Sequence, residues 1–318
     1  MKPAIGITLG DTFGVGPELC VKSLRSFDFK KARVKIFATQ ADFRVLARRM
    51  KLDISNLESI VEFSESFSCA VPENKDDEHG RAMFCLEALK QASTEAMNGD
   101  IQSLVTGPLD KRIVRREEPT FTGHTDYLAD LSGVSKTVML LDNADISVAL
   151  LTHHIPLRDV GNKITKELIK ETVQIVNRAF REWFAKDNPK IAFTSVNPHA
   201  GELMDHSEEK DVLTPVIKEM ATSGLNVDGP FSADSFFSMA RGSKWDVIVS
   251  PYHDQGLVAV KYPGIDQVVN ITLGLPYLRI SPGHGVAYEL VGKNIAREHS
   301  FKRALDVALN RRLRHGQN

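Results

Sequence analysis

The sequence predicts an α/β protein, because short apolar strands alternate with amphipathic helices along the chain. The segment 246–250 reads Asp-Val-Ile-Val-Ser, an apolar run typical of a strand covered on both faces. Residues Ile169, Val173, Val176 and Phe180 recur every three or four positions, which is the spacing of a helix face that packs on a core. A chain of 318 residues, 42% of them hydrophobic, is long enough for two domains or one large domain.

The first half of the chain contains three predicted strands and four predicted helices. Strands are expected at 4–9, 34–38 and 101–105, where short apolar runs end in turn residues. Helices are expected at 19–24, 42–50, 81–97 and 127–131. The charged segment 73–80, which precedes the third helix, is assigned to a solvent-exposed loop.

The second half begins with a predicted hairpin. Its strands are 137–141 and 146–151, and the polar segment 142–145 separates them. The long amphipathic helix at 169–184 follows, and then a strand at 190–196. Helices at 211–222 and 233–237 lead to the strand 246–250.

The charge balance argues against a nucleic-acid or anionic-membrane partner. Lys and Arg number 40 against 41 Asp and Glu, so the formal net charge is -1. No global field then attracts a polyanion, and any anion site must be built locally.

Cysteine usage and hydropathy indicate a cytoplasmic protein. Cys20, Cys69 and Cys85 are odd in number, widely spaced and form no Cys-x-x-Cys motif, which favours a reducing compartment and core packing over a sulfur-ligated metal. No apolar run is long enough for a signal peptide or a membrane span.

Polar residues gather after the predicted strand 246–250. His253, Asp254 and Gln255 follow its carboxyl end, where open α/β sheets bind ligands. Lys261 and Asn270, with Arg279 further on, add groups suited to an anionic substrate beside a metal or proton-transfer centre. The alternative is that His253 and Asp254 form only a helix cap or a satisfied loop pair.

Three predicted strands lead into histidines, His154, His199 and His253. Loops at strand ends converge while the sheet holds them, so these imidazoles are candidate ligands of one metal ion such as zinc. His153 competes with His154 for that role. Asp254 and Asp234 are candidates to orient a ligand or to take a proton, with helix capping as the alternative for both.

Two glycine turns and one helix start are further candidates for ligand contacts. Gly14 and Gly16 lie between the first strand and its helix, and Thr106 with Gly107 follows the strand 101–105. Each turn either exposes backbone N–H groups to a ligand or is simply a tight turn. His124 and Thr125 open a predicted helix, where they form an anion seat or a cap.

Eight motifs in order along almost the whole chain resemble the 4-hydroxythreonine-4-phosphate dehydrogenase family. The motifs are Gly10-Asp11-x-x-Gly14-x-Gly16-Pro17-Glu18, Thr106-Gly107-Pro108, Gly123-His124-Thr125, Thr152-x-His154-x-Pro156-Leu157, Asn197-Pro198-His199-Ala200-Gly201-Glu202, Gly229-Pro230-x-x-Ala233-Asp234, His253-Asp254-Gln255-Gly256 and Asn270-x-Thr272-x-Gly274-Leu275-Pro276-x-x-Arg279. Two departures stand out: Thr12-Phe13 replaces the common Pro-Ala, and Gly283 replaces a common acidic residue.

The resemblance implies two α/β/α domains with a cleft between them, as in the isocitrate and isopropylmalate dehydrogenases. The first domain would comprise residues 1–118 and 275–318. The second would comprise residues 119–274 and carry the metal ligands and the interface of a homodimer with a shared active site.

The resemblance also implies roles for individual residues. His154 and His199 of one subunit, with the residue matching His253 from the partner, would bind one divalent metal such as zinc, magnesium or cobalt. The substrate-binding positions are His124, Thr125, Lys261, Asn270 and Arg279. NAD, with NADP as the alternative, would bind without a Rossmann fingerprint, and Gly14, Gly16, Thr106 and Gly107 are candidates to contact it. Lys261, Asp254 and Asp234 are the candidate catalytic residues.

The implied reaction is the oxidation and decarboxylation of 4-(phosphooxy)-L-threonine to 3-amino-2-oxopropyl phosphate in pyridoxal 5'-phosphate biosynthesis. Related members suggest D-threonate 4-phosphate or D-erythronate 4-phosphate as alternative substrates. Two readings from other classes remain open, a metal-dependent hydrolase and a non-catalytic protein that binds a phosphorylated ligand.

Overall fold

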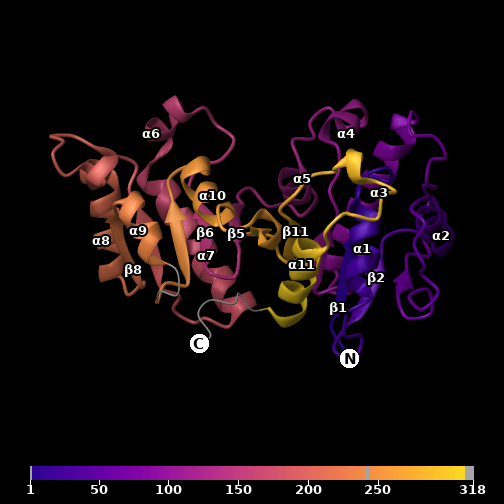
Figure 1. Cartoon of the computed structure of the whole chain (residues 1–318). Coiled ribbons are helices and arrows are strands. Elements are labelled where there is room, and N and C mark those ends of the chain that lie inside the picture. Colours follow the sequence, from indigo (N-terminus) through magenta and orange to yellow (C-terminus); the bar gives the residue numbers. More distant parts are fainter. Residues whose placement is uncertain (1, 241–243, 312–318) are drawn as a thin grey trace. The chain divides into compact units, whose positions relative to one another are not determined.

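The computed structural model describes residues 2–240 and 244–311, and it confirms the predicted α/β class (Figure 1). The chain divides into two compact units. Unit 1 comprises the residues up to Thr137 together with Leu275–Asn310, so both ends of the chain contribute to it. Unit 2 comprises Val138–Gly274 together with Arg311.

Unit 1 contains a parallel sheet in the order β3-β2-β1-β4-β11. Its strands are β1 Ala4–Thr8, β2 Arg33–Ile36, β3 Glu62–Phe63, β4 Ser103–Thr106 and β11 Leu278–Pro282. Its helices are α1 Gly16–Leu24, α2 Gln40–Arg49, α3 Glu78–Met97, α4 Lys111–Glu117, α5 His124–Leu131 and α11 His299–Asn310, with the short helix η5 Tyr288–Leu290. Because β1, β4 and β11 run parallel, their carboxyl ends lie at one edge.

Unit 2 contains a mixed sheet in the order β10-β5-β6-β9-β7-β8. Its strands are β5 Val138–Asp142, β6 Ser147–Leu150, β7 Ile191–Thr194, β8 Val227–Phe231, β9 Val247–Ser250 and β10 Val269–Leu273. β5 and β6 form the predicted hairpin, and β6, β9, β7 and β8 are parallel. Its helices are α6 Val160–Lys163, α7 Lys166–Phe184, α8 Thr214–Thr222, α9 Ala233–Ala240 and α10 His253–Lys261, with the short helices η1 Leu157–Asp159, η2 Pro198–Gly201, η3 Glu209–Leu213 and η4 Ile265–Gln267.

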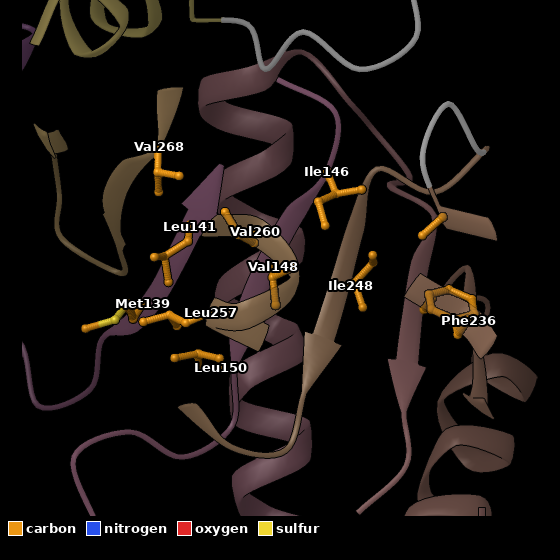
Figure 2. Close-up of a cluster of buried hydrophobic side chains, with 12 residues drawn as sticks. Met139, Leu141, Ile146, Val148, Leu150, Phe236, Ile248, Leu257, Val260 and Val268 are labelled. Carbon is orange, nitrogen blue, oxygen red and sulfur yellow. The ribbon is translucent and has the colours of Figure 1, made fainter. Parts of the chain in front are cut away.

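A buried apolar cluster fixes α10 on the sheet of unit 2. Figure 2 shows Leu257 and Val260 of α10 facing Leu141, Val148 and Leu150 of β5 and β6. Each such side chain contributes roughly 1.5–3 kcal/mol when it is removed from water. The packing therefore holds the first residue of α10, His253, at the end of β9.

One boundary between the two compact units differs from the expected domain boundary. The expected division after residue 118 would place 119–137 in the second domain, but these residues belong to unit 1. The reason is packing, because α5 lies against α3 and Ser132 Oγ donates a hydrogen bond of 3.3 Å to Tyr277 Oη. Tyr277 Oη also lies 3.0 Å from Ser93 Oγ on α3. The chain returns from unit 2 to unit 1 between Gly274 and Leu275, where the sequence analysis also put a boundary.

Four strands were not expected from the sequence: β3, β8, β10 and β11. β8 contains Gly229 and Pro230, residues that argue against a strand interior. It pairs with β7 and stands at the end of the strand order among the described residues, a position where a missing N–H donor is tolerated. Among the described residues no helix is long and apolar enough to cross a membrane.

The cysteines behave as expected for packing residues. Cys20 and Cys85 are buried, and Cys69 is half-buried. Burial raises the pKa of the Cys20 and Cys85 thiols above the ordinary range. A thiol held protonated is a poor nucleophile and a poor metal ligand.

Candidate active site

A buried guanidinium lies at the carboxyl edge of the unit 1 sheet. Arg279 of β11 is only 2% exposed. Its Nη2 and Nε donate hydrogen bonds of 2.7 and 3.2 Å to Oγ1 of Thr106, the last residue of β4. Burial lowers the pKa of Arg279 to about 10, against the opposite influence of Tyr277. The surroundings therefore disfavour the charge of Arg279 without removing it at neutral pH, and a bound anion would stabilise that charge.

His124 lies beside this guanidinium. It is the first residue of α5, and its ring makes a hydrogen bond to the Gly107 backbone. Its Nε2 is buried, and no hydrogen-bond partner for it occurs within the described ranges. Burial lowers the pKa of His124 well below 6.5, and the charges of Arg279 and Lys111 lower it further. The imidazole is thus neutral, with one nitrogen still available to a ligand.

Lys111 brings a second cation to the start of α5. A Cβ on Gly123 would lie only 3.2 Å from Lys111 Nζ, so the glycine lets the ammonium approach closely. We call Arg279, His124, Lys111 and Thr106 the anion pocket. Thr125, in the first turn of α5, follows directly. Two cations, an imidazole and a helix N-terminus are groups that favour an anion such as a phosphate ester.

The expected cofactor-contacting glycines have a packing role in the structure. A Cβ on Gly16 would lie 2.1 Å from Leu9 O, and a Cβ on Gly107 would lie 2.4 Å from the same oxygen. A Cβ on Gly14 would lie 3.2 Å from Val286 O. Only glycine allows these backbones to pack so closely. The three glycines remain candidates for cofactor contacts, because their close packing brings together the loops that contain Gly14, Gly107 and Val286.

The two departures from the family pattern lie near the same loops. The Phe13 ring packs between guanidinium groups, with Arg49 Cζ 3.9 Å and Arg81 Cζ 5.4 Å from its centroid. Phe13 thus makes cation–π contacts that stabilise the loop. Gly283 donates its backbone N–H to Ser300 Oγ over 2.9 Å, which joins β11 to α11.

Two of the three candidate metal ligands lie together in unit 2. The ring centroids of His154 and His253 are 5.7 Å apart, because each follows one of the parallel neighbours β6 and β9. His153 also contacts His154, with ring centroids 5.1 Å apart. His154 is exposed and adopts a φ of 54°, a left-handed conformation that is rare outside glycine and is concentrated at functional sites.

The third candidate, His199, lies on η2 after β7. It is exposed and has a φ of 52°, and Ala200 beside it has a φ of 53°. The charge of His199 contributes to a lowered pKa of Asp234, which hydrogen bonds from Ser232 and the Ser235 backbone lower more strongly. In the described part of the chain His199 makes no ring contact with His154 or His253.

Glu209 holds the loop that carries His199. The Glu209 side chain is buried and its Oε1 accepts hydrogen bonds from Val196 N at 2.7 Å and Asn197 N at 2.8 Å. Its Oε2 accepts a third from Asn197 Nδ2 at 3.0 Å, and Glu208 accepts another from Asn197 Nδ2 at 2.6 Å. The sequence reasoning did not find Glu209, and its place ten residues after His199 carries no motif of its own.

The described part of the chain contains no group of three neighbouring side chains suited to metal binding. Across residues 2–240 and 244–311 no group of three or more His, Cys, Asp or Glu side chains is placed to hold a metal ion. The strand-end pattern suggested that all three histidines bind one metal ion, and the resemblance suggested that two subunits share this site; both stay predictions.

The remaining candidates also divide between the two units. Asp254 is exposed and its Oδ1 lies 2.7 Å from His253 Nδ1. Asp234 Oδ1 accepts a hydrogen bond of 2.7 Å from Ser232 Oγ, as in a helix start. Lys261 ends α10 and Asn270 lies on β10, so both belong to unit 2 with the histidines. The anion pocket belongs to unit 1.

Comparison with known proteins identifies the family. The family model described as the pyridoxal phosphate biosynthetic protein PdxA matches residues 21–308. The chain belongs to the PdxA family. The PdxA family assignment confirms the resemblance found in the sequence, and the chain is an enzyme of the oxidoreductase class.

Individual members of the PdxA family are similar to this chain over nearly its whole length. A 4-hydroxythreonine-4-phosphate dehydrogenase of Bacteroides thetaiotaomicron is 36% identical over 326 residues, covering 97% of this chain and 88% of that protein. The crystal structure of a 4-hydroxythreonine-4-phosphate dehydrogenase from Burkholderia phymatum has a TM-score of 0.83 and 29% identity, covering 99% of this chain and 100% of that one. A beta-decarboxylating dehydrogenase of Thermococcus kodakarensis shares the fold, with a TM-score of 0.51, 15% identity and coverage of 96% and 83%.

Proposed function

We propose that the chain catalyses the NAD-dependent and divalent-metal-dependent oxidation and decarboxylation of 4-(phosphooxy)-L-threonine. The product would be 3-amino-2-oxopropyl phosphate, an intermediate of pyridoxal 5'-phosphate biosynthesis. The single observation that carries the proposal is the anion pocket, which is built for a phosphate ester in a chain of the PdxA family.

The anion pocket would bind the phosphate group of the substrate. The planar Arg279 guanidinium is held by Thr106, so little side-chain freedom is lost when it donates to phosphate oxygens. Hydrogen bonds of this charge-assisted kind contribute about 1.5–3 kcal/mol each. One ring nitrogen of His124 is bonded to the Gly107 backbone, so Nε2 is the atom that would meet the ligand. Nε2 would donate to a phosphate oxygen in the protonated ring, a form that a bound anion favours.

The histidines of unit 2 fit a divalent metal by their donor chemistry. His154, His199 and His253 offer neutral nitrogen ligands, and the first two are held in left-handed backbone conformations that loop packing must maintain. A bound zinc, magnesium or cobalt ion would supply Lewis-acid stabilisation of negative charge on substrate oxygen. NAD, or NADP in its place, would supply the hydride acceptor.

The neighbouring polar residues would orient ligands and move protons. Asp254 accepts from Nδ1 of His253 in the tautomer that leaves Nε2 free for coordination, so it would orient the ring. Lys261 is the candidate for proton transfer, and Asn270 would bind the substrate beside it. The Asp234 carboxylate would interact electrostatically with His199, because the charge of His199 helps to lower the pKa of Asp234.

The active site is proposed to be shared within a homodimer. Residues 2–240 and 244–311 of one chain place His154 and His253 together without completing a three-ligand group, which leaves a role for a second subunit.

A side-by-side assay tests the proposed substrate. Purified enzyme with metal and NAD should form NADH with 4-(phosphooxy)-L-threonine at a higher kcat/KM than with D-threonate 4-phosphate or D-erythronate 4-phosphate. A preference for either sugar acid would reassign the enzyme to sugar-acid catabolism. Release of phosphate without NADH would indicate a hydrolase, and stabilisation of the fold without turnover would indicate a binding protein.

A further inference from the structure

A cavity lined by several cationic side chains lies in unit 1. Its volume is about 310 Å³, and none of its lining residues is shared with the anion pocket. Four cations line it against two carboxylates; these six residues are Lys75, Arg81, Arg112, Arg116, Glu78 and Asp110. The volume is at the small end of ligand sites, which span roughly 300–1,000 Å³. The cavity therefore suits a small molecule rather than a protein segment.

The floor of this cation-lined cavity is rigid. Arg81 Nη2 donates hydrogen bonds to Asp11 Oδ2 at 2.6 Å and to Tyr288 Oη at 2.8 Å. Tyr288 Oη in turn donates to Asp11 Oδ2 over 2.6 Å and lies 3.1 Å from Asp110 Oδ2. The Arg81 and Asp11 side chains are only 4% and 3% exposed, so removing either partner would strand a buried charge. This network fixes the Tyr288 ring in place.

The mouth of the cavity is adaptable. The Arg112 side chain is 86% exposed in its ion pair with Asp110, and the Arg116 side chain is 69% exposed in its ion pair with Glu78. Exposed ion pairs of this kind contribute only about 0–1 kcal/mol, so either guanidinium can turn to a ligand at small cost. A guanidinium fork matches the oxygens of a phosphate group.

Lys75 supplies a cation without a carboxylate partner. Its Nζ lies 5.1 Å from the centroid of the Tyr288 ring, and within residues 2–240 and 244–311 it makes no ion pair. The cavity thus combines a fixed aromatic floor, one ammonium with no counter-ion and two exchangeable guanidinium groups. That arrangement favours a ligand with more than one negative charge.

We propose that this cavity binds the phosphate group of a small phosphorylated molecule, in addition to the substrate held by the anion pocket. Two sources supply that chemistry, a nucleotide cofactor that carries an extra phosphate and a free phosphate compound. The first source is favoured by position, because Val286, two residues before Tyr288, contacts the turn that contains the candidate cofactor-binding residues Gly14 and Gly16. The Val286 carbonyl accepts a hydrogen bond of 3.0 Å from Val15 N in that turn. The proposal does not depend on the proposed reaction, because its test measures binding.

The test is calorimetric titration of the full-length protein with inorganic pyrophosphate at low ionic strength. Lys75→Ala and Arg116→Ala should each weaken binding about fivefold. Arg115→Ala is the matched control, because Arg115 is exposed on the same helix α4 but does not line the cavity. All variants keep the residues of the anion pocket, so pyrophosphate binding there is the same in each. A difference in pyrophosphate affinity between the variants therefore reports on the cavity.

A second titration distinguishes the two sources. If the cavity takes a nucleotide phosphate, NADP binds more tightly than NAD, and Arg116→Ala reduces that ratio while Arg115→Ala does not. If it takes a free phosphate compound, pyrophosphate binding falls in Lys75→Ala and Arg116→Ala while the NADP to NAD ratio stays near one. Equal pyrophosphate affinity in wild type, Lys75→Ala, Arg116→Ala and Arg115→Ala would overturn the proposal.

Discussion

The Glu209 carboxylate binds both the backbone N–H and the side-chain amide of Asn197, at 2.8 and 3.0 Å. Asn197 begins the turn in which His199 and Ala200 both have positive φ. A left-handed conformation of two successive non-glycine residues costs roughly 1–3 kcal/mol for each residue, so it persists only where its surroundings impose it. We infer that Glu209 imposes the conformation that presents His199.

Glu209→Gln tests this inference. The amide keeps the size of the side chain but turns one acceptor into a donor that faces the Asn197 N–H groups. The free energy of unfolding should fall by about 1–3 kcal/mol. Binding of zinc, measured by titration calorimetry, should weaken as well. Glu208→Gln is the control, because Glu208 makes only one of these hydrogen bonds, and an equal loss in both variants would contradict a specific role for Glu209.

Arg279→Lys should weaken substrate binding more than it slows turnover. Lysine keeps the charge but replaces a planar fork with a point charge, so the two hydrogen bonds to Thr106 cannot both be kept. KM for the phosphorylated substrate should rise about tenfold, with a smaller change in kcat. Steady-state kinetics at saturating NAD measures both quantities. An unchanged KM would remove Arg279 from the anion pocket's ligand-binding role.

His124 should make stability depend on pH. Its folded pKa is lowered well below 6.5, so between the two pKa values the unfolded chain binds more protons than the folded one. Stability is therefore complete above pH 6.5 and falls as pH decreases below it, by up to about 1.4 kcal/mol per pH unit. Urea unfolding at about pH 5.5 and about pH 7.5 measures this loss.

His124→Gln is the control for that pH dependence. The burial of His284 also lowers its pKa and gives a loss of the same sign, so the difference between wild type and His124→Gln isolates His124. Sulfate, which does not titrate in this range, should reduce the loss in wild type only, because an anion in the pocket favours the protonated ring. Identical pH profiles in the two proteins would contradict the assignment.

A shared site predicts complementation between two inactive variants. His199→Ala and His253→Ala should each be inactive as homodimers. When both are co-expressed, mixed dimers contain one complete set of histidines, and random pairing would give about a quarter of wild-type activity. Activity assays on the purified mixture measure this recovery. If no activity returns although mixed dimers form, the ligands do not come from two subunits.

Sequence reasoning succeeded where the signal was periodic or carried a motif. The strand 246–250 and the helix at 169–184 were predicted because burial on a sheet or a helix face repeats at fixed spacing. Arg279 and His124, which the motifs singled out, lie close together in unit 1, and their binding role stays a prediction.

The residues that sequence reasoning missed depend on long-range packing. Lys111 reaches the anion pocket because Gly123, twelve positions later, leaves room for it. Glu209 bonds to Asn197 across a segment whose sequence shows no repeating apolar spacing. Lys75 was assigned to a solvent-exposed loop, although it lines a cavity. The segment 119–137 lies in unit 1 and not in the unit of the expected second domain, because contacts such as that of α5 with α3 are not visible in the sequence.

The central claim is that this chain couples hydride transfer to loss of CO2 from a phosphorylated amino acid. The most direct test is to measure NADH and CO2 together from 4-(phosphooxy)-L-threonine, with the divalent metal present and after its removal by a chelator. We expect equal amounts of NADH and CO2 with metal, and neither product without it. Phosphate release with no NADH, or NADH formation that is unaffected by the chelator, would contradict the account.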